Sequence, residues 1–195
     1  MILPIVAYGD PVLKKVAAEI SSDFPNLDTL IADMWETMYH AEGVGLAAPQ
    51  IGKSIRLFVI DGAPFSKDED LTPAEQVQLA SFKKVFINAK ILEEAGAVWS
   101  FTEGCLSIPD IREDVQRHEE LTIRYQDEKF DWHTEKFTGL AARIVQHEYD
   151  HIEGVLFTDK LSSLKKRLIK GKLDKIAKGL TQADYRMKYY QPKKR

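Results

Sequence analysis

The sequence contains a single cysteine, Cys105, among 195 residues, so no disulfide can form within the chain. An oxidising compartment is therefore not implied. A membrane-spanning helix is not expected either, because no apolar run approaches the roughly 20 residues that a bilayer requires. The opening residues M-I-L-P-I-V-A-Y-G-D lack the basic start and the long apolar core of a signal peptide. These absences predict a cytoplasmic protein with no membrane partner.

The length and the hydrophobic share of 44% suit one well-buried domain, which we expect to span residues 1–195. The net charge of -3 hides an asymmetry along the chain. Residues 160–195 hold 13 Lys or Arg against 2 Asp, whereas the first 159 residues hold 14 basic and 28 acidic residues. The body is therefore predicted to be acidic, and residues 162–195 to form a basic helix and tail.

Two histidines four residues apart, with a glutamate directly after the first, lie in the stretch from Thr138 to Gly154. Residues at i and i+4 of a helix share one face, so His147 and His151 could both bind a single metal ion. Thr138 is placed to cap such a helix, and Gly154 is placed to end it. The alternative is a pair of ordinary half-buried histidines.

Glu148 gives the histidine pair a possible chemistry. It points about 100° round the helix from His147, so its carboxylate could meet a water on the ion without being a ligand. The motif predicts metal-assisted hydrolysis with Glu148 as general base, although H-E-x-x-H is short enough to arise by chance. Leu140 and Ile144 continue the histidine stripe, which predicts that the imidazoles extend an apolar, core-facing surface.

Two further segments have compositions suited to a ligand. The first, G-V-G-L-A-A-P-Q from Gly43 to Gln50, is either a tightly packed loop or a place where the backbone approaches a ligand and Gln50 offers an amide. The second, E-G-C-L-S from Glu103 to Ser107, is expected to be irregular and holds the lone thiol. A thiolate and two imidazoles form a three-ligand set with a fourth position open for water. A nucleophilic cysteine with a histidine partner is the alternative, disfavoured because the paired histidines demand a third ligand.

Hydrophobic periodicity predicts helices mixed with strands. A first helix is expected over 26–41, and the acidic segment 61–82 is expected to be a surface excursion with a short helix that begins at a capping box. A last helix is expected from about Ser162, with inward-facing side chains at Leu164, Leu168, Leu173 and Ile176. Strands are expected over 55–60, 85–88 and 91–99 and in a β-hairpin before the histidine helix. Residues 191–195 are expected to form a flexible tail.

In this order, the blocks G-V-G-L-A-A-P-Q, E-G-C-L-S and Q-H-E-Y-D-H resemble those of the peptide deformylase family. The similarity extends from I-V-A-Y-G-D-P-V-L through I-E-G-V-L-F-T-D-K-L and covers most of the chain. It implies an enzyme that removes the formyl group from the N-terminal formylmethionine of new polypeptides and releases formate. It also implies an α+β fold, with antiparallel β-sheets around a central metal-binding helix, an N-terminal helix and a C-terminal helix.

The resemblance implies roles for individual residues. Cys105, His147 and His151 match the metal ligands of the family, and Glu148 matches its catalytic general base and acid. The other matches bind substrate: the formyl oxygen is bound by Gln50 and the backbone N–H of Leu106, the extended peptide by Val44 and Gly45, and the methionine side chain by Phe101, Leu140 and Ile144. Glu103 and Arg112 match charged positions of the family, without a duty that the sequence defines.

The resemblance also implies a cofactor and partners. One divalent ion is expected, Fe2+ in the native enzyme, with Zn2+ or Ni2+ in purified material; the Cys-His-His set alone suits zinc as well as ferrous iron. Formylmethionyl nascent polypeptides are the expected partners, with a hypothetical contact between the basic C-terminal helix and the ribosome, and no DNA is expected. Two rival classes stay open: a zinc endopeptidase, which shares H-E-x-x-H, and a noncatalytic RNA-binding module, suggested only by the basic tail.

Overall fold

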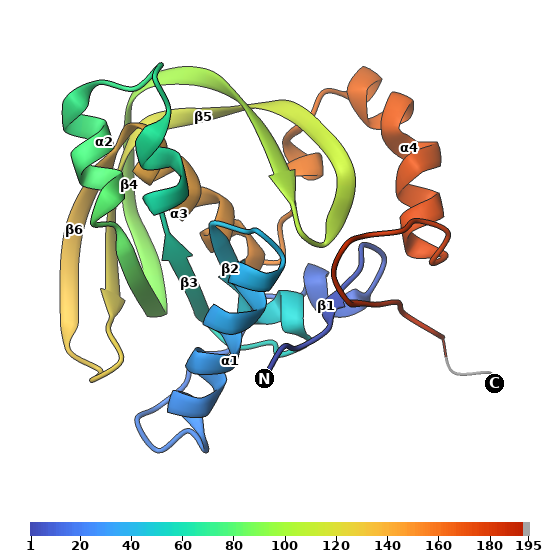
Figure 1. Cartoon of the computed structure of the whole chain (residues 1–195), viewed down its shortest axis with the longest axis horizontal. Coiled ribbons are helices and arrows are strands. Elements are labelled where there is room, and N and C mark those ends of the chain that lie inside the picture. Colours follow the sequence, from blue (N-terminus) through green and yellow to red (C-terminus); the bar gives the residue numbers. More distant parts are fainter. Residues whose placement is uncertain (193–195) are drawn as a thin grey trace.

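Helix α3 (Gly139–Ile152) lies at the centre of the molecule, with the other elements arranged around it (Figure 1). The computed structural model describes residues 1–192. Ten of the 14 residues of α3 are buried, so the helix is enclosed on most sides. Thr138 is its N-cap, and Gly154, with a φ of 71°, follows its C-cap residue. The predicted helix between Thr138 and Gly154 is therefore confirmed.

An antiparallel sheet of five strands packs against α3, in the order β2-β3-β4-β5-β6. Strand β2 lies at one edge of this sheet, so one side of its backbone is not paired within the sheet. Figure 1 shows the β4–β5 hairpin leaving the sheet and crossing the molecule. The predicted α+β fold is confirmed. The strands are β2 (Gly45–Ala47), β3 (Leu57–Asp61), β4 (Lys83–Cys105), β5 (Ile108–Gln126) and β6 (Trp132–Thr138).

The β4–β5 hairpin is bent because its pairing register shifts at four places. Such irregularities increase the local twist and redirect a strand without ending it. Asn88 and Gly96 lie at two of the shifts, with φ values of 52° and 77°. The sequence predicted two separate strands here and an irregular segment at 103–107. The separation into two strands is wrong, because the alternation of apolar residues breaks at the bends while the pairing continues to Cys105, opposite Ile108. The irregular segment is confined to the turn at Leu106 and Ser107, since residues 103–105 belong to β4.

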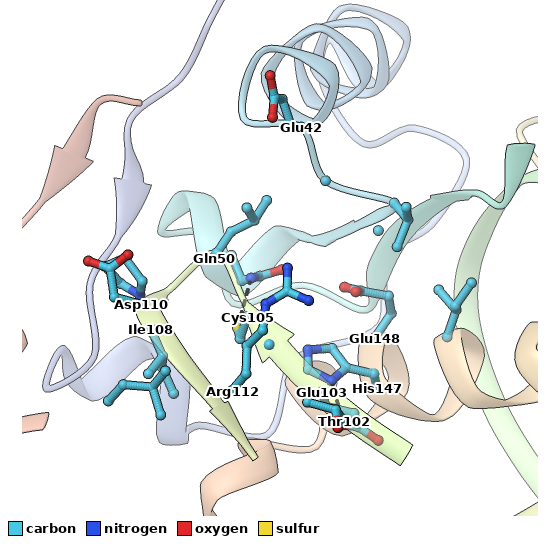
Figure 2. A pocket seen from close by; sticks show the side chains of 18 of the residues that line it. Glu42, Gln50, Thr102, Glu103, Cys105, Ile108, Asp110, Arg112, His147 and Glu148 are labelled. Carbon is cyan, nitrogen blue, oxygen red and sulfur yellow. Dashed lines mark hydrogen bonds and ion pairs between the residues drawn. The ribbon is translucent and has the colours of Figure 1, made fainter. Parts of the chain in front are cut away.

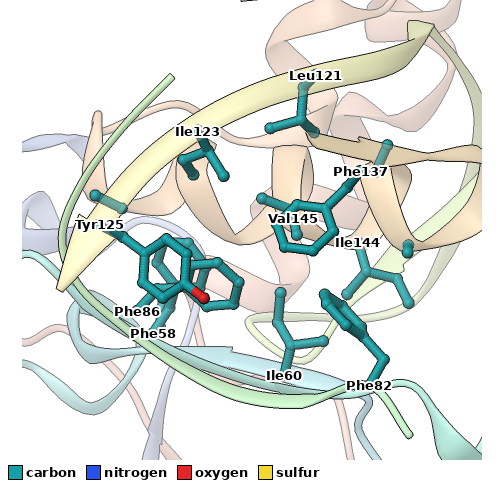
Figure 3. Close-up of a cluster of buried hydrophobic side chains, with 14 of the residues drawn as sticks. Phe58, Ile60, Phe82, Phe86, Leu121, Ile123, Tyr125, Phe137, Ile144 and Val145 are labelled. Atoms are coloured by element: carbon teal, nitrogen blue, oxygen red, sulfur yellow. The ribbon is translucent and has the colours of Figure 1, made fainter. Parts of the chain in front are cut away.

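A cluster of aromatic and aliphatic side chains fills the space between the sheet and α3 (Figure 3). Phe58 stacks on Phe86 with ring centroids 4.6 Å apart, and Phe86 meets Tyr125 at 4.4 Å. Val145 contributes to this cluster from α3. Burying such side chains stabilises a fold by roughly 1.5–3 kcal/mol each. The cluster therefore holds α3, and the histidines at its C-terminal end, against the sheet.

Three further helices lie around this core: α1 (Leu27–His40), α2 (Pro73–Ala80) and α4 (Ser163–Ala177). The predicted first helix and the capping box of α2 are confirmed. Helix α4 buries Ile169, Leu173 and Ile176, whereas Leu164 and Leu168 are 60% and 72% exposed. The expected inward packing of Leu164 and Leu168 is wrong, because the buried stripe runs one position further along the chain. Short 3-10 helices occur at Pro11–Lys14, Ala48–Ile51, Ala63–Lys67 and Phe157–Lys160.

The two ends of the chain meet in a small parallel sheet formed by β1 (Ile5–Val6) and β7 (Met187–Lys188). The Ile5 N–H donates to the Arg186 carbonyl at 2.9 Å, and the Ala7 N–H donates to the Lys188 carbonyl at 2.9 Å. Residues 193–195 of the predicted flexible tail lie outside the described residues. Within residues 1–192, no helix combines the length and apolar character needed to cross a bilayer.

Candidate metal centre and active site

Three potential metal ligands converge where the tip of β4 meets the last turns of α3. The ligand atoms of Cys105, His147 and His151 all lie within 4.8 Å of one another, and the Cys105 Sγ is 3.4 Å from the His151 Nε2. Ideal tetrahedral zinc with sulfur and nitrogen ligands would separate these atoms by roughly 3.3–3.6 Å. One sulfur and two imidazoles therefore fit a single divalent ion.

Glu103 orients the first histidine of the pair. Its Oε2 lies 2.9 Å from the His147 Nδ1. In the neutral imidazole this hydrogen bond requires the proton on Nδ1, which leaves the Nε2 lone pair free for an ion. The contact between a carboxylate and the outer nitrogen of a ligating histidine is the usual support for such a ligand. Glu103, a charged position without a defined duty in the sequence, therefore acts on His147 directly.

The Glu103 carboxylate is buried, and two arginines compensate its charge. Arg117 binds both of its oxygens, at 2.7 and 2.9 Å, and Arg143 binds Oε1 at 3.0 Å. Burial alone would raise the pKa of Glu103, but the hydrogen bonds from Arg117 and His147 hold that pKa well below its ordinary value. Arg117 also pairs with Asp150 at 2.6 Å. Removing one member would leave a buried charge unpaired, which is costly. The arginines therefore hold the Glu103 carboxylate in place, and that carboxylate in turn holds His147.

Sequence reasoning missed both arginines. Arg143 lies four residues before His147, hence on the same face of α3, and this spacing was a signal that could have identified it. Arg117 gave no comparable signal, because its position beside Glu103 depends on the course of the bent β4–β5 hairpin in space.

Glu148 is a buried carboxylate aimed into the site. The residue is only 4% exposed, and within residues 1–192 its Oε2 has no hydrogen-bond partner. Burial raises the pKa of Glu148 to about 7, even though the nearby His147 opposes this shift. Gly45 makes the close approach possible, because a Cβ at that position would collide with the Glu148 carboxylate. Figure 2 shows Glu148 beside His147, both facing the same cavity.

Gln50 presents a hydrogen-bond donor on the opposite side of the thiol. Its Oε1 accepts from the Ala47 N–H at 2.8 Å, so the Nε2 is turned toward the site. That nitrogen lies 3.5 Å from the Cys105 Sγ and 3.5 Å from the Ser107 Oγ. Leu106 follows Cys105 in the two-residue turn between β4 and β5, outside the paired strands. An amide side chain and a turn backbone therefore border the proposed ion position.

A cleft of about 880 Å³ is lined by Gln50, Cys105, Leu106, His147 and Glu148. Every predicted substrate-binding residue lines it: Val44, Gly45, Phe101, Leu140 and Ile144. Glu42, Asp110, Arg112 and Asp184 add charge around the same cleft. Gly45 is the first residue of the edge strand β2 and lines the cleft, so an extended peptide in the cleft could reach the open edge of the sheet there.

Among the lining residues that were not predicted, some come from segments to which no chemistry had been assigned. Phe65 comes from the acidic excursion at 61–82, which had no chemistry attached to it. Residues 182–185 come from the segment after α4 and line the same cleft. No periodicity or motif in the sequence marked either segment.

An H-E-x-x-H helix and a cysteine thiol that together fit one ion, with a buried glutamate beside it in an open cleft, define a metal-dependent hydrolase. The family model for polypeptide deformylase matches residues 2–167. The chain belongs to the peptide deformylase family and is an enzyme of this type.

Relatives and solved structures agree with this membership. The peptide deformylase of Flavobacterium johnsoniae is 64% identical over 194 residues, which is 100% of this chain and 99% of the relative. That of Christiangramia forsetii is 61% identical over 194 residues, with 100% and 99% covered. The crystal structure of the Thermus thermophilus peptide deformylase superposes with a TM-score of 0.78 at 38% identity and covers 92% of this chain and 99% of that one.

Proposed function

We propose that this enzyme removes the formyl group from the N-terminal formylmethionine of newly made polypeptides and releases formate. The observation that carries the proposal is the convergence of Cys105, His147 and His151 beside Glu148. Because the substrate emerges at the ribosome, we place the enzyme in the cytoplasm.

Cys105, His147 and His151 would hold one divalent ion, with ferrous iron as our choice for the native metal. When bound, the ion supplies Lewis acidity that activates a water and polarises the formyl carbonyl. The protein contributes the orientation of the ligands, since Glu103 fixes His147 at 2.9 Å. It also contributes burial, because a low-dielectric site strengthens each electrostatic interaction.

Glu148 moves the proton in this proposal. The Glu148 carboxylate lines the cleft, and its Oε2, which has no hydrogen-bond partner within residues 1–192, takes a proton from the attacking water. The same oxygen then delivers the proton to the departing amine, so Glu148 returns to its starting state after each turnover. Gln50 Nε2 and the Leu106 N–H donate to the formyl oxygen as negative charge develops on it. The fixed Gln50 amide supports this role, because it needs no reorientation during the reaction.

The substrate lies along the open edge of β2 in this proposal. Val44 and Gly45 offer backbone groups to an extended peptide, in the manner of an added strand. Phe101, Leu140 and Ile144 line the apolar part of the cleft and receive the methionine side chain. A free amine in place of the formyl amide would leave the formyl-binding donors unused.

A formyl-capped peptide separates this function from that of an endopeptidase. Protein purified without oxygen, with its metals quantified, is expected to release formate from formyl-Met-Ala-Ser and to leave internal bonds intact. The matched control is the same peptide with an acetyl cap, for which we expect at least about a hundred-fold lower rate because the added methyl group crowds the reacting carbon. Cleavage of internal bonds, or equal rates with both caps, would contradict the proposal.

We further infer that α4 contacts ribosomal RNA. Its exposed face carries Lys166, Arg167, Lys170, Lys172 and Lys175. Each basic side chain that no longer binds a phosphate should lower the slope of log affinity against log salt by about 0.7–0.9. We expect Lys170→Glu with Lys175→Glu to weaken ribosome binding and flatten this slope. The control pair Lys53→Glu with Lys129→Glu, exposed elsewhere, should bind like wild type; indistinguishable behaviour of the two pairs would contradict the inference.

A further inference from the structure

We propose that Tyr185 is a positioning residue for the turn that carries Leu106. The inference rests on the proposed function, in which the Leu106 N–H binds the formyl oxygen. Tyr185 belongs to the segment 182–185 that lines the cleft, and this segment lies beyond residue 167, where the match to the family model ends.

The first support is a direct hydrogen bond between the segment and the turn. The Tyr185 hydroxyl donates to the Leu106 carbonyl at 2.8 Å, the usual length for an O–H···O bond. The carbonyl and the N–H of Leu106 lie on either side of one Cα. They belong to two successive peptide planes that are joined through the φ and ψ angles of Leu106. Fixing the plane that carries the carbonyl therefore narrows the range of orientations open to the neighbouring plane that carries the N–H.

A second anchor holds the next residue of the turn. The Ser107 carbonyl accepts from the Tyr8 N–H at 2.8 Å. Tyr8 lies just after β1 in the chain and Tyr185 lies just before β7, and these two strands pair with each other. Both anchors of the turn therefore come from residues that flank the small β1–β7 sheet.

The ionisation of Tyr185 is compatible with this role. Burial raises the pKa of Tyr185. The phenol therefore stays protonated at neutral pH and remains a donor. Donors to a developing oxyanion are effective only when their positions are set before the reaction. A loosened Leu106 would bind the formyl oxygen less well in the transition state while leaving substrate binding largely intact.

The chain offers a matched control four residues away. Tyr189 also donates its hydroxyl to a backbone carbonyl, that of Thr181, at 3.0 Å. Tyr189 does not line the cleft. Removing either hydroxyl costs one neutral hydrogen bond in the part of the chain after α4. If both tyrosines had only a structural role, the two variants would show similar effects on kcat and on stability.

The experiment compares Tyr185→Phe and Tyr189→Phe in the full chain, at equal metal content, with formyl-Met-Ala-Ser as substrate. Tyr185→Phe is expected to lower kcat about three- to ten-fold, the range for one neutral hydrogen bond, with KM within about two-fold of wild type. Tyr189→Phe is expected to keep the wild-type kcat. Equal kcat values in both variants, or a change confined to KM, would overturn the proposal.

Hydrogen exchange measured by mass spectrometry provides a readout that does not depend on activity. Residues 104–108 are expected to exchange faster in Tyr185→Phe than in wild type or Tyr189→Phe, with similar melting temperatures for the two variants. Unchanged exchange in this stretch would overturn the anchoring role. If wild type released no formate, the proposed function would fail, and the exchange data would still decide whether Tyr185 holds the turn.

Discussion

Replacing Glu148 with alanine is expected to lower kcat for formate release by about 100- to 10,000-fold, the range that general acid–base groups contribute. The metal content should stay at the wild-type level, because Glu148 is not one of the three converging ligands. Formate release and elemental analysis on the same preparation measure the two quantities. Loss of formate release with retention of the metal ion is the result that a proton-transfer role predicts.

Two companion variants sharpen this prediction. Glu148→Gln keeps the side-chain volume against Gly45 but cannot take a proton, so its kcat should fall in the same range. Glu94→Ala, at an exposed glutamate on β4, should behave as wild type. Substantial turnover by either Glu148 variant would remove Glu148 from its assigned role.

Replacing Cys105 with serine is expected to weaken metal binding by at least about a hundred-fold, beyond the 10- to 100-fold typical of partners outside the first ligand shell. A neutral hydroxyl replaces a thiolate, and two imidazoles alone do not complete the site. Metal retained after dialysis against a chelator measures the effect, and formate release should fall in proportion to the ion that is removed.

His40→Ala is the control for the cysteine variant, because His40 is an exposed histidine at the end of α1. It should retain metal and activity at wild-type levels. If Cys105→Ser held one ion as firmly as wild type, the thiol would not be a ligand, and the alternative of a nucleophilic cysteine would return to consideration.

The parts of this structure that could be predicted are those whose information is local in sequence. Helix α3 was predictable because its cap, its alanines and its histidine spacing all lie within 17 residues. The capping box of α2 was equally local. The pairing of Cys105 with the histidines was an inference from chemistry, since 42 residues separate the thiol from His147.

The parts that could not be predicted depend on pairing between distant segments. Arg117 lies opposite Trp99 and not opposite Glu103 in the β4–β5 pairing, so its contact with Glu103 depends on the course of the bent hairpin in space, which no residue pattern fixes. Leu164 and Leu168 are apolar and have helical spacing, yet both are exposed. The buried face of α4 depends on the elements that pack against the helix, and the helix sequence alone does not identify them. The role of residues 182–185 follows from the pairing of β7 with β1, at a separation of about the whole chain.

That pairing sets an order of events during synthesis. The ribosome makes β1 before α3, and it makes the partner strand β7 after α3. A chain still growing can build α3 and bring its histidines to Cys105, because all of these residues precede β7. It cannot yet close the side of its cleft that contains Tyr185. The cleft thus gains its finished shape only after the segment that contains Tyr185 and β7 has left the ribosome.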